Sequence, residues 1–335
     1  MTDLVLSPKL EEAKKLIKES ERILLAGHVS PDGDSLGSLL ALSQAIRDNL
    51  GKETLPYMTD DRVPSSLDFL PGSDELTEDV PWFPDLIIGV DYGDFERLAL
   101  PNEMIESAKL ITFDHHPESG QKGDVNIIDT SFSSTAELVY IFLKSSGWQI
   151  SSSVATCLLV GILTDTGGFS HNTSARTFNV AGELLQKGAP LSKIYTKALT
   201  KGPHVLKAWG DVLSSAEIDE GLNLIVGKVS VEKFLHYGIV LDDLEELKNR
   251  LNALRKNSIA LLLMEPEKGL IKGSFRSTEP NGADVSFLAE KLGGGGHKHA
   301  AAFNIEGASM EEVEEKAKSA LQEAIEEKSI KLDIR

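Results

Sequence analysis

The first half of the chain alternates short apolar runs with stretches whose apolar residues recur at helical spacing. The runs predicted as strands are ILLAGH at 23–28, ETLPYM at 53–58, DLIIGVD at 85–91 and KLITFDHH at 109–116. Residues 35–50 follow the first run and predict a helix. Strands that alternate with helices indicate an α/β fold, with a parallel sheet and helices on both of its faces. Ligands of such sheets bind beyond the carboxyl ends of the strands.

The second half begins with helices and then changes to a smaller mixed pattern. Residues 134–166 predict two helices separated by GWQISSS, and 175–215 predict helical structure with interruptions at 188–190 and 202–203. Strand-like runs follow at LNLIVGKVS, SIALLLMEP, GLIKGSFRS and AAAFNIEG, with helices expected at 242–255, 283–292 and 309–327. We therefore expect a parallel-sheet domain at 1–195, a helical linker at 196–218 and a smaller mixed α/β domain at 219–335.

Composition and charge narrow the classes of function. The 335 residues include 34 Lys and Arg against 52 Asp and Glu, for a net charge of −18. Long nucleic acids are usually held by basic surfaces, so this balance argues against a binder of long DNA or RNA. The one cysteine, Cys157, excludes a disulfide framework and a cysteine-built zinc site. No apolar run approaches the ~18 residues of a membrane span, and no signal pattern is present. We therefore expect a cytoplasmic protein with no membrane partner.

Acidic and histidine residues gather in four clusters, three of them after predicted strands. The clusters hold His28, Asp32 and Asp34; Asp91 and Asp94; Asp114, His115 and His116; and Asp165. Each cluster alone has a simpler interpretation, because an Asp after a strand is often a turn residue or a helix cap. Asp34 has this alternative for the helix at 35–50. Together the clusters predict a metal site, since gathered carboxylates repel one another without a cation. Mixed oxygen and imidazole ligands suit divalent ions such as Mn²⁺ or Co²⁺ better than Ca²⁺.

The clusters and the later motifs resemble those of a known family. HVSPDGDSLGS, VDYGD, FDHH and GILTDTGGF are similar, in this order, to the four motifs of the DHH phosphoesterases. KGSFRS and DVSFLAEKLGGGGHKHAAAF resemble the DHH-associated domain. Within the family the resemblance is nearest to the nanoRNase/pAp phosphatases. It implies a metal-dependent hydrolase of short oligoribonucleotides (nanoRNA, the dinucleotide pApA) and of 3′-phosphoadenosine 5′-phosphate.

The resemblance also implies roles for individual residues. Two divalent ions are expected, with Mn²⁺ favoured over Mg²⁺ and Co²⁺. One ion would be held by His28, Asp32 and Asp91, and the other by Asp34, Asp91, His115 and Asp165, so that Asp91 bridges. His116 would act beside the metals as an acid or a phosphate contact, and Asp114 would orient a histidine. Asp91, Asp114 and His116 are the expected catalytic residues.

Substrate binding is assigned to the second domain. The expected residues are Arg276, Ser277, Gly294, Gly295, Gly296 and His297. The glycine run would offer backbone N–H groups to a phosphate, although a flexible turn explains the same run. The sequence departs from the family pattern twice: Arg-x-Arg is replaced by Ser274-Phe275-Arg276, and the stretch after the glycines is Ala300-Ala301-Ala302. Because this grip is compact and the chain is acidic, we expect substrates of about two to five nucleotides.

Other functions remain open on the sequence alone. A cyclic di-AMP phosphodiesterase is the nearest alternative. A manganese inorganic pyrophosphatase shares the first motifs but not GGGGH, and a RecJ-type exonuclease would need further domains and a basic channel. A non-catalytic nucleotide sensor would lack a ligand, whereas every expected ligand is present. The sequence does not decide between a monomer and a homodimer.

Overall fold

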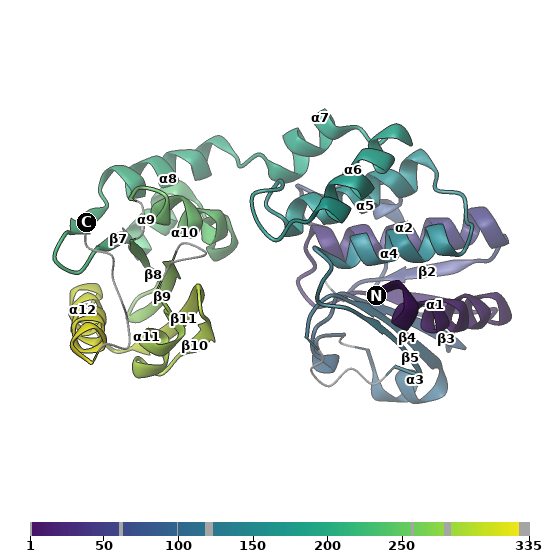
Figure 1. Ribbon diagram of the computed structural model, residues 1–335, viewed down its shortest axis with the longest axis horizontal. Coiled ribbons are helices and arrows are strands. Elements are labelled where there is room, and N and C mark those ends of the chain that lie inside the picture. Colours follow the sequence, from purple (N-terminus) through teal and green to yellow (C-terminus); the bar gives the residue numbers. More distant parts are fainter. Residues whose placement is uncertain are drawn as a thin grey trace. The chain divides into compact units, whose positions relative to one another are not determined.

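The chain forms two compact units, residues 1–200 and residues 201–335. The computed structural model describes residues 2–59, 63–98, 100–117, 123–255, 258–277 and 283–327. Figure 1 shows a sheet with its own helices in each unit. None of the helices in these ranges is long and apolar enough to cross a membrane.

The first unit is built on a parallel sheet. Among the described residues its strands are β2 (Thr54–Tyr57), β1 (Ile23–Ala26), β3 (Leu86–Val90), β4 (Lys109–Asp114) and β5 (Val125–Ile128), in that spatial order. All neighbouring pairs are parallel. The order places β1, β3 and β4 side by side, so their carboxyl ends share one stretch of the sheet edge.

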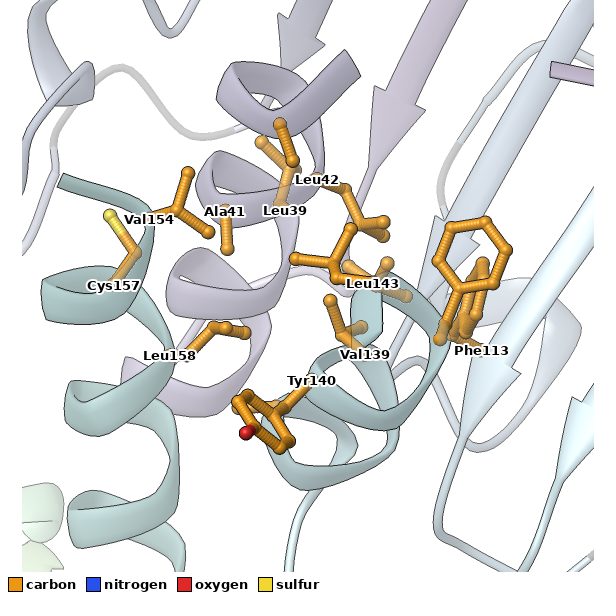
Figure 2. Packing of buried hydrophobic residues seen from close by; sticks show 14 of the residues in the cluster. Leu39, Ala41, Leu42, Phe113, Val139, Tyr140, Leu143, Val154, Cys157 and Leu158 are labelled. Carbon is orange, nitrogen blue, oxygen red and sulfur yellow. The ribbon is translucent and has the colours of Figure 1, made fainter. Parts of the chain in front are cut away.

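Helices cover both faces of this sheet, as the sequence predicted. One face packs on α1 (Thr2–Glu19), α2 (Gly33–Leu50), α4 (Thr135–Ser145) and α5 (Ser152–Asp165). The other packs on α3 (Asn102–Ser107) and the 3₁₀ turn η2 (Phe95–Leu98); a further 3₁₀ turn, η1, spans Ser73–Glu75. Figure 2 shows side chains of α2, α4 and α5 meeting in the larger core, with Cys157 among them. The unit ends with α6 (Ala175–Gln186), α7 (Leu191–Ile194) and the π-helical turn η3 (Tyr195–Leu199).

The close packing of α2 on α5 fixes where their ends lie. Gly37 faces Cys157 so closely that a Cβ at Gly37 would stand 2.4 Å from the Cys157 carbonyl oxygen. Any side chain there would push the helices apart. α2 begins at the first acidic motif and α5 ends at Asp165, so this contact brings acids together that are far apart in sequence.

The second unit has a mixed sheet. The order of its described strands is β10 (Gly295–His297), β11 (Ala300–Glu306), β9 (Leu270–Ser277), β8 (Ile259–Glu267), β7 (Leu224–Val229) and β6 (Glu217–Asp219). One face packs on α11 (Ser286–Lys291) and α12 (Met310–Glu326). The other packs on α8 (Pro203–Ser214), α9 (Val231–Tyr237), the 3₁₀ turn η4 (Leu241–Leu244) and α10 (Glu245–Asn252). α8 lies inside the range predicted as a linker and packs against β7 and α9.

The α/β fold class predicted from the sequence is confirmed, and the motif-bearing strands and helices begin and end within a few residues of the predicted positions. α1, α3, β5, β6 and α9 have no counterpart in the sequence-based assignment. The glycine run differs too, because residues 295–297 are not a turn but the edge strand β10. β10 pairs antiparallel with β11, and the local sequence pattern does not predict this pairing.

Candidate metal centre

Seven acidic and histidine side chains converge at the carboxyl ends of β1, β3 and β4. They are His28, Asp32, Asp34, Asp91, His115, His116 and Asp165, and we call them the acid–imidazole cluster. His28 follows β1, Asp91 follows β3, and the two adjacent histidines follow β4. The two acids of the first motif lie at the start of α2, and Asp165 is the last residue of α5. All six metal ligands expected from the sequence are thus in one place.

The cluster contains three sets of possible ligand atoms, and the atoms within each set lie within 4.8 Å of one another. They are His28, Asp32 and Asp91; Asp34, His115 and Asp165; and Asp91, His115 and His116. Asp91 stands between two histidines, since Oδ2 lies 3.8 Å from Nε2 of His28 and Oδ1 lies 3.7 Å from Nε2 of His115. Each oxygen of this one carboxylate therefore faces a different part of the cluster.

His28 and His115, the two histidines expected as metal ligands, each present a ring nitrogen to the carboxylates. Nδ1 of His28 lies 2.7 Å from the Val29 carbonyl oxygen, so the tautomer with a proton on Nδ1 leaves the Nε2 lone pair facing Asp32 and Asp91. In the described part of the chain, Nε2 of His115 is buried and makes no hydrogen bond. A buried polar atom without a partner is costly, and a divalent cation would provide one. The residues present therefore fit a metal site.

Three carboxylates of the cluster, those of Asp34, Asp91 and Asp165, are held where their charge is unfavourable. Burial, reinforced by a neighbouring carboxylate, raises the pKa of Asp34 and of Asp165 to about 7. Burial and repulsion from Asp34 and Asp32 raise the pKa of Asp91 well above its usual range. Bound cations reverse this balance, because they favour the charged form of each ligand.

Asp91 also has an unusual backbone. Its φ of 55° lies in the left-handed region, and its N–H donates to the Phe113 carbonyl oxygen at 2.9 Å. Left-handed backbone at a residue other than glycine is uncommon, although Asp and Asn tolerate it better than most. Strained residues of this kind concentrate at functional sites. Here the left-handed backbone directs the carboxylate of Asp91, which is 2% exposed, toward His28 and His115.

The N-terminus of α4 closes the buried side of the cluster, and the sequence motifs did not reveal it. Thr135 Oγ1 donates to Asp91 Oδ1 at 2.9 Å. The amides of Thr135 and Ala136 donate to the two oxygens of Asp34 at 2.6 and 2.8 Å. The partial positive charge of a helix start stabilises such carboxylates. Ser134–Glu137 has the capping pattern S-x-x-E, which marks a helix start but not what lies in front of it.

The alternative interpretation of Asp34 as the cap of its own helix does not hold. The N-cap of α2 is Asp32, whose Oδ1 accepts from the amides of Asp34 and Ser35 at 2.9 and 3.0 Å. Burial acts to raise the pKa of Asp32, but the nearby His28 ring and the hydrogen bonds from these amides hold it below its usual value. Asp34 is left to face the cluster.

Asp114 is fully buried and binds both the backbone and the ring of His116. Its Oδ1 accepts from the backbone N–H of His116 at 2.9 Å and lies 2.9 Å from Nδ1 of the same residue. Its Oδ2 accepts from the Gly93 amide at 2.8 Å. The hydrogen bond with Asp114 raises the pKa of His116. Asp114 therefore fixes the ring of His116 and favours its protonated form.

The residues expected to bind substrate lie together near β9, β10 and β11 of the second unit. Arg276 is in β9, where Nη1 donates to Ser274 Oγ and to the Phe275 carbonyl oxygen, both at 2.9 Å. The hydroxyl of Ser277 donates to the Ala283 carbonyl oxygen at 2.6 Å and lies 2.9 Å from Nδ1 of His299. This hydroxyl is therefore engaged inside the unit.

The glycine run packs tightly on β11. The amide of Gly294 donates to the Ala289 carbonyl oxygen at 2.8 Å, at the end of α11. A Cβ at Gly294 would stand 2.1 Å from the Ala302 carbonyl oxygen, and a Cβ at Gly296 would stand 2.5 Å from Cα of Ala301. Closeness to β11 alone therefore requires glycine at these two positions. Gly295 and His297 pair with Ala302 and Ala300 in the same hairpin.

Comparisons with known proteins agree with this architecture. Residues 22–162 match the DHH family, N-terminal domain, and residues 222–327 match the DHHA1 domain. The bifunctional oligoribonuclease and PAP phosphatase NrnA of Thermus thermophilus is 29% identical over 95% of this chain and 96% of its own length. NrnA of Bacillus subtilis is 29% identical over 88% of this chain and 92% of its own length.

A solved structure supports the fold over the same extent. The exopolyphosphatase-related protein from Bacteroides fragilis superposes with a TM-score of 0.83 at 26% identity, covering 95% of this chain and 96% of that one. The two matched domains follow each other in the order that the sequence motifs predicted. The chain belongs to the DHH family, with a DHH domain in its first unit and a DHHA1 domain in its second.

Proposed function

We propose that this protein is a metal-dependent phosphodiesterase that hydrolyses short oligoribonucleotides, pApA among them, and 3′-phosphoadenosine 5′-phosphate. The observation that carries the proposal is the acid–imidazole cluster, in which buried carboxylates face a histidine nitrogen that makes no hydrogen bond within the described chain. Support for the substrate class comes from the two relatives named bifunctional oligoribonuclease and PAP phosphatase.

Two divalent ions would be held by the cluster. His28, Asp32 and Asp91 would hold one, and Asp34, Asp91, His115 and Asp165 the other. Asp91 suits the bridging position because its two oxygens face different histidines. Imidazole together with carboxylate ligands favours Mn²⁺ among the ions considered. When bound, such ions supply Lewis-acid chemistry that activates water and neutralises phosphoryl charge.

His116 is proposed to give a proton to the leaving oxygen. Its Nδ1 is engaged by Asp114, so the other ring nitrogen is the one that can reach a substrate. The pKa of His116 is raised by that hydrogen bond, which keeps the ring protonated at higher pH. The side chain is 43% exposed, whereas that of His115 is 10% exposed, and this difference favours His116 for substrate contact.

Arg276 is proposed to bind a second phosphate of the substrate. Among the described residues, Arg47, Arg176 and Arg255 form ion pairs with acids, whereas Arg276 forms none. Partial burial lowers the pKa of Arg276, so an anionic ligand would offset the cost of placing its charge there. Arginine also binds phosphate through two parallel hydrogen bonds. Gly295, Gly296 and His297 lie on the β10–β11 hairpin, whose strand β11 pairs with the strand of Arg276, and complete the proposed grip.

The proposal is tested with the purified protein, with and without Mn²⁺, on a panel of substrates separated by chromatography. The panel comprises pApA, a pentaribonucleotide, 3′-phosphoadenosine 5′-phosphate, cyclic di-AMP and pyrophosphate. We expect metal-dependent cleavage of the short RNAs, and no turnover with excess chelator. Preferred cleavage of cyclic di-AMP or of pyrophosphate would replace the proposed substrate class. Absence of metal-dependent turnover of any member would point instead to a nucleotide sensor.

A further inference from the structure

Arg97 lies beside the acid–imidazole cluster and belongs to none of its motifs. It is in η2, the 3₁₀ turn that follows the Asp91 loop, and its side chain is exposed. Its backbone carbonyl oxygen accepts from the Val29 amide at 2.9 Å, and Nη2 lies 3.0 Å from Nδ1 of His28. The backbone of Arg97 is thus hydrogen-bonded to the segment that carries His28, and its guanidinium lies beside the ring of that histidine.

The histidine contact does not use the hydrogen-bonding capacity of the guanidinium. Nδ1 of His28 lies even closer, at 2.7 Å, to the Val29 carbonyl oxygen. In the tautomer that turns a free Nε2 toward Asp32 and Asp91, Nδ1 carries the proton and cannot accept from Arg97. Among the described residues, Arg97 forms no ion pair with an acid, whereas three other arginines do. No ion pair with another described residue therefore compensates its charge.

The side chains of Arg97 and His116 both lie beside Gly93. A Cβ placed on Gly93 would stand 3.7 Å from Nη1 of Arg97 and 3.8 Å from Cγ of His116. Both side chains therefore flank the space that the missing side chain of Gly93 leaves free. Gly93 has a φ of 63°, so a larger residue would be strained there.

We propose that Arg97 is a further catalytic residue, whose guanidinium donates hydrogen bonds to a non-bridging oxygen of the scissile phosphate. This inference rests on the proposed phosphodiesterase function. A guanidinium binds phosphoryl oxygens in a fixed, two-donor geometry. It acts most strongly where negative charge grows during the reaction. On a chain with a net charge of −18, a cation at this point also offsets the repulsion that an incoming anion meets.

The test compares Arg97→Ala and Arg97→Lys with Arg22→Ala. Arg22 is exposed and immediately precedes β1, at the end of the strand opposite His28, so its loss removes the same charge away from the cluster. Three quantities are measured on the Mn²⁺-loaded proteins: metal content by elemental analysis, the affinity for inorganic phosphate by calorimetry, and kcat/KM for bis-p-nitrophenyl phosphate and pApA.

We expect Arg97→Ala to keep its metal content and to lose about 10- to 100-fold in kcat/KM for both substrates. Phosphate affinity should fall with it, Arg97→Lys should lie between, and added guanidinium should restore part of the Ala variant's rate. Two results would overturn the proposal: a variant that behaves like Arg22→Ala, or one that loses metal, which would make Arg97 a positioning residue for His28. Phosphate binding is read without turnover, so an inactive wild-type protein would count against the proposed function and leave this test standing.

Discussion

Replacing Thr135 by valine removes one hydroxyl from the buried side of the acid–imidazole cluster and changes the shape of the side chain little. That hydroxyl donates to Asp91 Oδ1 at 2.9 Å, and Thr135 is fully buried. A hydrogen bond to a charged group contributes about 1.5–3 kcal/mol, and a buried acceptor left without its donor bears the full penalty. Each ~1.4 kcal/mol corresponds to a factor of ten. We therefore expect Thr135→Val to weaken metal binding by roughly 10- to 100-fold, in line with the effect of partners behind metal ligands.

The assay is a competition of the protein with a fluorescent chelator for Mn²⁺, accompanied by kcat/KM at saturating metal. Thr156→Val is the matched control, because its hydroxyl donates to the Ser152 carbonyl oxygen inside α5. The control should bind metal like the wild-type protein. A Thr135→Val variant with wild-type affinity for Mn²⁺ would refute the reasoning, since it would show that the orientation of Asp91 does not depend on α4.

Three further outcomes are expected. Asp91→Asn should abolish turnover yet, in chelator, melt no lower than the wild-type protein, because it relieves buried carboxylate repulsion while Asn tolerates the left-handed backbone; a lower melting temperature would contradict this. His115→Ala should lose bound metal and His116→Ala should keep it but lose rate, as judged by elemental analysis; equal metal loss would remove the distinction. Arg276→Ala should reduce kcat/KM for pApA far more than for bis-p-nitrophenyl phosphate, which has no second phosphate; an equal reduction for both substrates would contradict the role of Arg276. The related preference for short substrates would be refuted by a wild-type protein that cleaves a 24-mer as fast as a dimer.

The position of the cluster could be predicted from the sequence because the relevant signals are local. An apolar run followed by Asp or His marks the end of a buried strand, and the end of a parallel strand is where ligand sites lie. Asp91 and His115 were found in this way. Since β1, β3 and β4 are neighbours in the sheet, strand-end residues meet without any further information.

The support around the cluster could not be predicted, because it depends on contacts distant in the sequence. The capping pattern at Ser134 predicts a helix start. That this start faces Asp34 and Asp91 is decided only by how α4 packs on the sheet. The glycine run shows the same limit. Its composition suggests a loop, while its structure is set by the close approach of β11 to Gly294 and Gly296.

The residues of the acid–imidazole cluster are scattered along the chain from His28 to Asp165, and this affects how the unit folds. Contacts between distant segments form late, because the chain between them must first be ordered. Until α5 is in place the site lacks Asp165, and its gathered carboxylates oppose assembly. Metal would therefore bind the completed unit in preference to its precursors. Binding at one hundred times the dissociation constant adds about 2.7 kcal/mol to the folded state, so the ions of the proposed reaction would also lock the domain after synthesis.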